Sequence, residues 1–407
     1  MDQTSTTSPP SLRYGRQMVA TPGPSVIPDR VLAAMAKPMP NMYQGEILDI
    51  TDRLLATLPT IARTTAPTFV VIANGHGAWQ MAICNTLSRG DKILALESGR
   101  FAVFWGEMAA ISGVEVEVLP GTDNDPVDPA AVQARLAADT DHEIKAIMVV
   151  QTDTATSVKN DLAAIRAAID AANHPALYMA DCIASLGCDR FEMDEWGIDV
   201  TVAGCQKGLM VPPGVSFVWA SEKAMAAYES ADLRTGYFDW DSRLNAEAHY
   251  QIFAGTPPIP HLYGLDEALS MIEEEGGIEA VWDRHQVLGD AVRAAVDTWS
   301  KPGFIESNIQ IPAARSNAVT TVLTGSADAI ELARICNDLA GLTLGIAIGE
   351  FAGRAVRIAH MGHLNPPMIL GTLGTVEAAL KAMDVPLGGS GVAAAVDVIS
   401  EALNRSA

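Results

Sequence analysis

The stretch TVAGCQKGLMVPPGVSFVWAS, residues 201–221, places a lysine between an apolar run and a turn. Lys207 follows residues 200–204, which are small or β-branched, and a Pro-Pro-Gly sequence comes shortly after it. Most lysines are merely solvated, but a lysine held near an apolar sheet can lose basicity and act as a nucleophilic amine. Lys207 is therefore the first candidate catalytic residue.

Short apolar segments like the one before Lys207 recur through the first two thirds of the chain. They are residues 69–74, 92–98, 114–120, 145–152, 176–182, 200–204 and 216–221. Most are separated by segments with helical periodicity. This alternation predicts an α/β fold with a mainly parallel sheet covered on both faces, and ligands bind such sheets beyond the carboxyl ends of the strands.

The last third of the chain has a different pattern. A long helical stretch, broken at Gly276-Gly277, leads into strands and helices on a smaller scale, which indicates a second, α+β domain. A chain of 407 residues also exceeds the usual size of a single core. We expect a disordered or arm-like N-terminus (1–18), a large domain (19–280, whose N-terminal segment joins the small domain) and a small domain (281–407).

The composition narrows the class of protein. A formal net charge of −22 disfavours nucleic acid or an anionic membrane as a partner. The five cysteines form no CxxC pair, so neither a disulfide framework nor a zinc knuckle is predicted. No signal peptide and no run of 18 apolar residues is present, and we expect a cytoplasmic enzyme.

Two further strand ends carry polar residues. Asn74-Gly75-His76-Gly77 lies between a strand and a helix, where glycines allow backbone N–H groups to approach a phosphate. A turn that needs glycine only for its geometry is an equal alternative for this stretch alone. Asp181 ends a strongly apolar strand and so needs a cation or donor as a partner, although it could also be a helix cap.

Arg357 is the fourth candidate, on an expected strand of the small domain. Its guanidinium could bind a substrate carboxylate, while a solvated surface arginine is the commoner case. His360 and His363 follow it, but no acidic or cysteine ligands cluster with them in the sequence, so no metal is predicted.

Six motifs occur in a characteristic order from about residue 19 to 390: TPGPSVIP, NGHGAWQ, ADCIASLG, DEWGIDVTVAGCQKGLMVPPG, GTPPIPHLYGLDEAL and RIAHMGH. In this set the chain resembles the class V pyridoxal-phosphate aminotransferases, the alanine-glyoxylate and serine-glyoxylate family. The resemblance implies fold type I architecture, pyridoxal 5'-phosphate as cofactor, and a homodimer with shared active sites.

The resemblance also implies a role for each candidate residue. Lys207 would bond to the cofactor aldehyde and shuttle a proton, and Asp181 would pair with the pyridine N–H. The other implied contacts are those to the phosphate (Gly75, His76, Gly77, Gln206 and Thr256 of the neighbouring subunit), to the phenolic oxygen (Thr154), to the ring face (Phe101) and to the substrate carboxylate (Arg357, with the backbone at Gly23).

Some positions depart from the family pattern. Phe101 and Phe253 stand where many members have tryptophan and tyrosine, Thr156-Ser157 where they have Thr-Gly, and residues 40–46 (PNMYQGE) where many have Asp-His-Arg-Ser. The implied reaction is ping-pong transfer of an amino group from serine, alanine or aspartate to a 2-oxo acid, most simply glyoxylate.

Three alternatives to this reaction stay open. One is a transaminase that uses pyruvate. A second is a cysteine desulfurase-like lyase, but Cys336 lies in a helical segment rather than in a mobile loop. The third is a non-catalytic relative, which loss of Lys207 or Asp181 would favour, and both residues are present.

Overall fold

The computed structural model describes residues 11–406. The first ten residues of the expected N-terminal arm lie outside this described part. From Leu12 onward the segment contacts the rest of the protein, because the Leu12 amide donates to the Leu339 carbonyl at 3.0 Å. Within the described range no helix is both long and apolar enough to cross a membrane.

The larger of two sheets has seven strands in the order β2-β8-β7-β6-β5-β3-β4. Their bounds are β2 Thr68–Val71, β3 Lys92–Leu96, β4 Glu115–Leu119, β5 Ile144–Val150, β6 Leu177–Asp181, β7 Val200–Gly204 and β8 Ser216–Ala220. β8 alone runs opposite to the other six strands. The predicted mainly parallel sheet is confirmed, and each strand overlaps one of the seven apolar segments, with β2 and β5 beginning one residue earlier than predicted.

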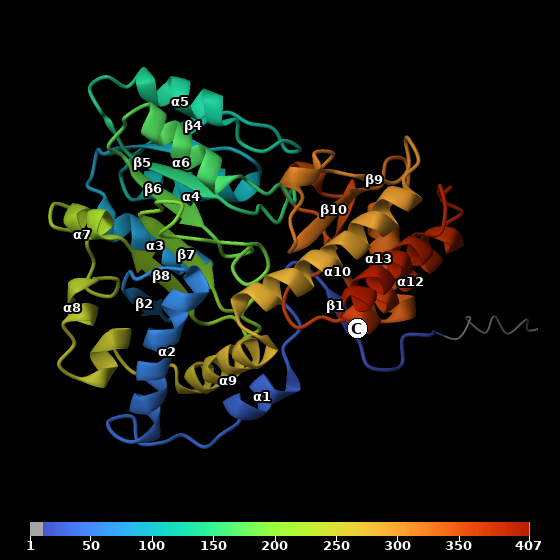
Figure 1. Ribbon diagram of the computed structural model, residues 1–407, viewed down its shortest axis with the longest axis horizontal. Coiled ribbons are helices and arrows are strands. Elements are labelled where there is room, and N and C mark those ends of the chain that lie inside the picture. The colour runs from blue at the N-terminus through green and yellow to red at the C-terminus, as the bar shows by residue number, and fades with distance from the viewer. Residues whose placement is uncertain (1–10, 407) are drawn as a thin grey trace, which may run out of the picture.

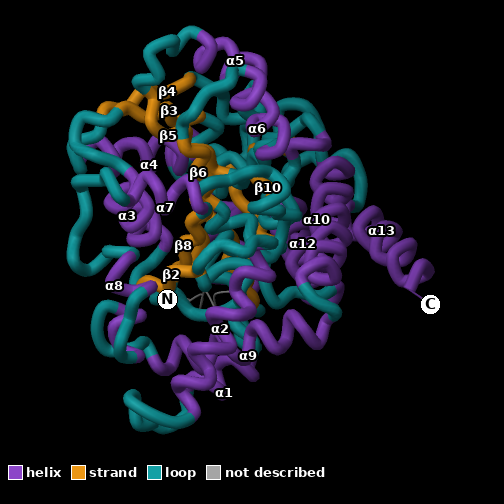
Figure 2. Tube along the Cα trace, turned by 60° about the vertical axis from the view of Figure 1, so that its left-hand side comes forward, coloured by secondary structure: helices purple, strands orange, loops and turns teal. Residues whose placement is uncertain are grey.

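Helices cover both faces of this sheet, as Figure 2 shows. Alternate residues of β6 enter different cores: Leu177 and Met179 pack with α3 (Gly75–Thr86), α4 (Arg100–Ile111) and α7 (Glu222–Tyr228). Tyr178 and Ala180 pack in the core of the opposite face, which contains helices α2 Glu46–Ala62, α5 Pro129–Ala137, α6 Leu162–Ala171 and α9 Ile259–Glu275. Burial on both faces explains why the central strands lack a polar side.

A second sheet has the order β1-β11-β12-β10-β9. Its strands are β1 Met18–Ala20, β9 Glu306–Ser307, β10 Val319–Leu323, β11 Leu342–Ile346 and β12 Ala355–Ala359. Helices that pack on it are α10 Ile278–Trp299, α11 Ala329–Arg334, α12 Pro366–Ala382 and α13 Gly391–Ser406. β1 pairs in parallel with β11, so the N-terminal segment is part of this smaller sheet.

Helix α10 runs from one body to the other (Figure 1). Its first turns, with Ile278 and Trp282, belong to the core of the larger sheet. From Leu288 onward its buried residues belong to the core of the smaller sheet. We keep the division at residues 280 and 281 as a proposal, with α10 as the helix that crosses it.

Candidate active site

A cavity of about 150 Å³ opens beyond the carboxyl ends of β5, β6 and β7. Seven of the predicted site residues line it: Gly75, His76, Phe101, Thr154, Asp181, Gln206 and Lys207. Strand ends from one edge of a parallel sheet meet here, which is where such folds bind ligands.

Asp181, the last residue of β6, is only 3% exposed. Its Oδ1 accepts the Ile183 amide N–H at 2.7 Å, and its Oδ2 accepts the Trp79 indole N–H at 2.9 Å. Burial raises the pKa of this carboxyl to about 7, and these two donors and the charge of Lys207 oppose the rise. A cation in the cavity would therefore gain by pairing with Asp181.

Lys207 follows β7 in the turn that the sequence singles out. Burial, and after it the charge of Arg357, lowers the pKa of its amine to about 8. Its Nζ donates to the Pro22 carbonyl, and a Cβ on neighbouring Gly23 would overlap Nζ. The unusual location of this lysine thus yields an amine that can lose its proton near neutral pH.

The glycine-rich turn forms the N-terminus of α3. Asn74 caps the helix by accepting the His76 amide N–H at 3.1 Å. A Cβ at Gly75 would overlap Ile183, so the backbone approaches the strand end more closely than any other residue would allow. Gly77 lies in the same helical turn but does not line the cavity. Helix N-termini of this kind favour anions.

The cavity residues suit the cofactor that the sequence implies. Gln206 lines the cavity, and its buried Oε1 has no hydrogen-bond partner within the described structure. An orphaned amide next to a helix N-terminus fits a polar ligand such as a phosphate ester. Asp181 fits a basic ring nitrogen, and the partly buried amine of Lys207 fits an aldehyde.

Arg357 lies beside the cavity without lining it. On β12 its neighbours Val356 and Ile358 enter the core under the small sheet, so its side chain leaves from the opposite face. Its Nη1 donates to the Thr154 carbonyl at 2.7 Å, and Nε and Nη2 donate to the Ile346 carbonyl. Burial lowers the pKa of this guanidinium to about 10, which still leaves it charged at neutral pH.

Thr256, which the resemblance implies as a phosphate contact, and residues 40–46, which depart from the family pattern, both lie away from the cavity of their own chain. Thr256 is exposed and residues 40–46 are largely exposed. Neither lines the cavity. Residues 40–46 contact the short helix His249–Phe253 that precedes Thr256, because a His249 ring nitrogen meets the Met42 carbonyl at 3.2 Å.

Sequence reasoning missed two buried residues of the site. Trp79 bonds to Asp181, but its spacing with Ile83 in the sequence indicated only a helix face. Asp153 accepts the amide N–H groups of Phe101 and Ala155 at 2.7 and 2.8 Å, and burial raises the pKa of its carboxyl to about 6. The sequence could have indicated Asp153 as a site residue because it is next to Thr154, a predicted site residue.

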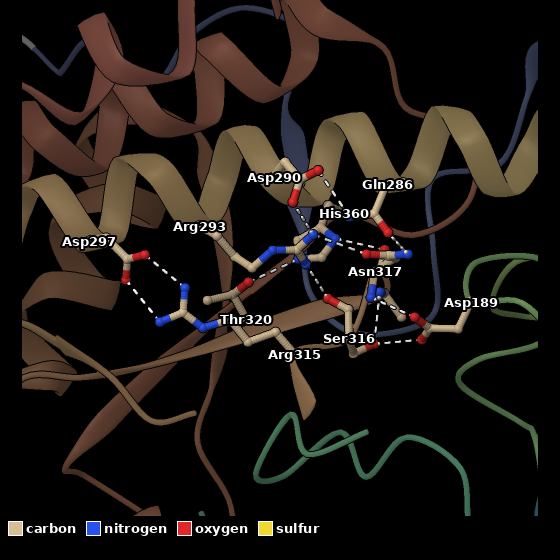
Figure 3. Close-up of polar contacts among 11 residues, drawn as sticks. Asp189, Gln286, Asp290, Arg293, Asp297, Arg315, Ser316, Asn317, Thr320 and His360 are labelled. Atoms are coloured by element: carbon tan, nitrogen blue, oxygen red, sulfur yellow. Dashed lines mark hydrogen bonds and ion pairs between the residues drawn. The ribbon is translucent and has the colours of Figure 1, made fainter. Parts of the chain in front are cut away.

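Figure 3 shows a polar network around Asp189, Ser316 and Asn317 at the start of β10. Asp189, only 1% exposed, accepts from the Ser316 hydroxyl at 2.7 Å and the Asn317 amide at 2.8 Å, both just before β10. It also accepts from the hydroxyl of Thr152, which lines the cavity, at 3.1 Å. One carboxylate therefore connects the sheet that carries Arg357 with the site.

His360 belongs to the same network. Its ring nitrogens contact the Asn317 carbonyl at 2.7 Å and the Thr320 hydroxyl at 3.0 Å. Among residues 11–406 no group of three His, Cys, Asp or Glu side chains is placed to hold a metal ion. All five cysteines are buried, and burial raises the pKa of the Cys336 thiol to about 12, which does not suit a nucleophile.

Fold and site together define a fold type I aminotransferase, and comparison with known proteins supplies the family. The profile described as aminotransferase class-V matches residues 61–359. The chain is 39% identical to a serine--glyoxylate aminotransferase of Methylorubrum extorquens over 96% of this chain and 97% of that protein. It is 35% identical to an L-aspartate--glyoxylate aminotransferase of Paracoccus denitrificans, with 92% and 94% covered. The protein belongs to the class V aminotransferase family.

Solved structures agree with this assignment. Ureidoglycine-glyoxylate aminotransferase from Bacillus subtilis superposes with a TM-score of 0.86 at 23% identity, covering 95% of this chain and 98% of that one. Pyridoxamine-pyruvate aminotransferase from Mesorhizobium loti also gives 0.86, at 25% identity, with 94% and 97% covered. Membership of the class V family implies dependence on pyridoxal 5'-phosphate and substrates that are amino acids and 2-oxo acids.

Proposed function

We propose that the protein transfers the amino group of a small L-amino acid to glyoxylate by a ping-pong mechanism with pyridoxal 5'-phosphate. The observation that carries this proposal is the convergence of Lys207 and Asp181 on one cavity, with Arg357 bonded to Thr154 in its wall. Gly75, His76 and Gln206 would hold the phosphate, and Phe101 and Thr154 the ring. When bound, the cofactor supplies an electron-withdrawing ring that makes the substrate α-proton removable.

Three residues of the chain have the other roles, which are proton transfer, pairing with the ring nitrogen and binding of the substrate carboxylate. Lys207, with its lowered pKa, would accept the substrate α-proton at Nζ and carry it in the transfer. Asp181 pairs with the ring nitrogen and keeps it protonated, since the buried carboxylate gains from a cationic partner. Arg357 has two N–H groups beyond the three given to carbonyls, and these can bind a substrate carboxylate.

The surroundings of Arg100 favour donors without a second carboxylate. Arg100 adjoins Phe101, which lines the cavity, and is therefore a second arginine to consider for a distal acidic group. It lines a separate hollow of about 270 Å³ together with four carboxylates: Glu97, Glu107, Asp123 and Glu350. Burial and the charges of Glu97 and Glu350 raise the pKa of Asp123, so this hollow already carries repelling negative charge. Serine and alanine therefore fit better than aspartate.

A substrate panel tests this function directly. Serine, alanine and aspartate are each paired with glyoxylate, pyruvate and oxaloacetate, apart from the two identity pairs alanine–pyruvate and aspartate–oxaloacetate, and kcat/KM is measured for each acceptor and donor. We expect glyoxylate to be the best acceptor and serine or alanine the best donor. A clear preference for pyruvate would favour the alternative transaminase, and no transfer with any pair would reject the proposal.

We also propose a homodimer in which Thr256 serves the site of the partner. Supporting this, Thr256 is exposed and residues 40–46 are largely exposed, and neither lines the cavity of its own chain. Residues 40–46 would then lie near the mouth of the partner's site, where they could influence the choice of substrate.

A further inference from the structure

We propose that Trp79 is a positioning residue for the reaction: its indole N–H fixes the Asp181 carboxylate in the orientation in which that carboxylate meets the ring nitrogen of the cofactor. This inference rests on the proposed function, because it concerns the same Asp181. The contact is direct, at 2.9 Å between Trp79 Nε1 and Asp181 Oδ2, and both residues line the cavity.

The indole is held rigidly. Trp79 is 0% exposed on α3 and stacks on Trp105 with ring centroids 5.9 Å apart and an interplanar angle of 15°. The rings of Phe104 and Phe101 meet it edge-on at 5.8 and 6.4 Å. Packed on several sides in this way, the indole cannot turn its N–H away from Asp181 without repacking the core.

The two oxygens of Asp181 are fixed from different elements. Oδ1 is held by the Ile183 amide, two residues further along the chain, and this bond alone would let the carboxylate rotate about its Cβ–Cγ bond. The Trp79 donor fixes the second oxygen and so the plane of the group. Each ionised oxygen has a second acceptor direction, which leaves capacity for a donor in the cavity.

The charges around Asp181 also favour a neutral hydrogen-bond donor such as the Trp79 indole. Burial and the charge of Asp153 favour the protonated form of Asp181, while Lys207 and the two N–H donors favour the ionised form, and the Cys182 thiol lies beside it. His76, next to the indole, is kept neutral by burial, which lowers its pKa. A neutral N–H stabilises the carboxylate without adding a positive charge that would compete with a cationic ring nitrogen.

Trp105 provides a matched control. It is also 0% exposed, belongs to the same aromatic stack, and its buried Nε1 has no hydrogen-bond partner in the described structure. Trp79→Phe and Trp105→Phe therefore remove similar apolar volume from the same layer. Only the first of them removes a hydrogen bond to Asp181.

The first measurement uses the full chain without cofactor. Carbon-13 NMR follows the Asp181 side-chain carboxyl against pH, with Asp181→Asn to assign the signal. We expect Trp79→Phe to move the midpoint about one pH unit higher, and Trp105→Phe to leave it in place. An unchanged midpoint in Trp79→Phe, or an equal change in both variants, would overturn the proposal. Because no substrate is used, this result does not depend on the proposed function.

The second measurement uses the loaded enzyme. Trp79→Phe should lower kcat about 10-fold with little change in KM, while Trp105→Phe stays within about 2-fold of wild type. If Trp79→Phe fails to fold, the benzothienyl analogue of tryptophan at position 79 keeps the ring shape and lacks the N–H. That protein should show the same two changes, and wild-type values in it would refute the proposal.

Discussion

Arg357 is held by the protein before any substrate arrives. Its bonds to the Thr154 and Ile346 carbonyls fix the plane of the guanidinium, and its remaining N–H groups keep a set direction. A lysine at this position would offer a point charge on a flexible stem, without the parallel donors that match a carboxylate.

We therefore expect Arg357→Lys to raise KM at least about 10-fold for both the amino donor and glyoxylate, because each carries the same carboxylate. Steady-state kinetics of both substrates provide the measurement. Arg100→Lys is the control and should leave both KM values unchanged. Equal KM values in wild type and Arg357→Lys would show that the substrate carboxylate binds elsewhere.

At the scale of elements, the Asp189 carboxylate joins the two sheets through hydrogen bonds. Its carboxylate accepts three donors, from Thr152, Ser316 and Asn317, in a setting that excludes water. Arg315 and Asp297 form an ion pair in the same region, but Asp297 is 48% exposed. The two carboxylates lie at opposite ends of the polar contacts drawn in Figure 3 and differ strongly in burial.

Asp189→Ala should lower the free energy of unfolding by roughly 3 kcal/mol or more, because it leaves the buried donors of Thr152, Ser316 and Asn317 without an acceptor. Asp297→Ala should cost under about 1 kcal/mol, as exposed ion pairs do. Urea denaturation measures the free energy of unfolding of both variants. Similar losses in the two would contradict the proposal that Asp189 stabilises the contact between the two sheets. We also expect Asp189→Ala to raise KM, since Arg357 sits on the sheet that Asp189 anchors.

The sequence predicted the strands of the large sheet well because most of them are short apolar runs, although β4 alternates glutamate with valine. Asp181 and Lys207 could be placed for the same reason, since strand ends meet at one edge of a parallel sheet. Trp79 and Asp153 could not be assigned roles in this way. Their functional contacts, to Asp181 and Phe101, join positions far apart in the chain, and only packing decides which helix turn faces which strand.

At the scale of the whole molecule, the proposed shared site makes a mixing experiment possible. Lys207→Ala and Thr256→Ala subunits are each purified, mixed and allowed to exchange. We expect Lys207→Ala alone to lose at least about 100-fold in turnover while still folding and binding cofactor, as loss of a nucleophile and general base requires.

If Thr256 completes the partner's site, a mixed dimer has one site with both defects and one intact site. Free exchange should then restore about a quarter of wild-type sites. If Thr256 acts within its own chain, every site in the mixture keeps one defect and no activity returns. A monomer in light scattering at working concentration would reject the shared site outright.

The pairing of β1 with β11 has a consequence for biosynthesis. Met18 lies opposite Leu342 in the small sheet, so the first strand to leave the ribosome finds its neighbour only when most of the chain has been made. Pro22 and Gly23, which follow β1 and contact Lys207, take their final places at the same moment. A nascent chain can thus assemble the large sheet early, yet its reactive amine stays uncovered until translation is nearly complete.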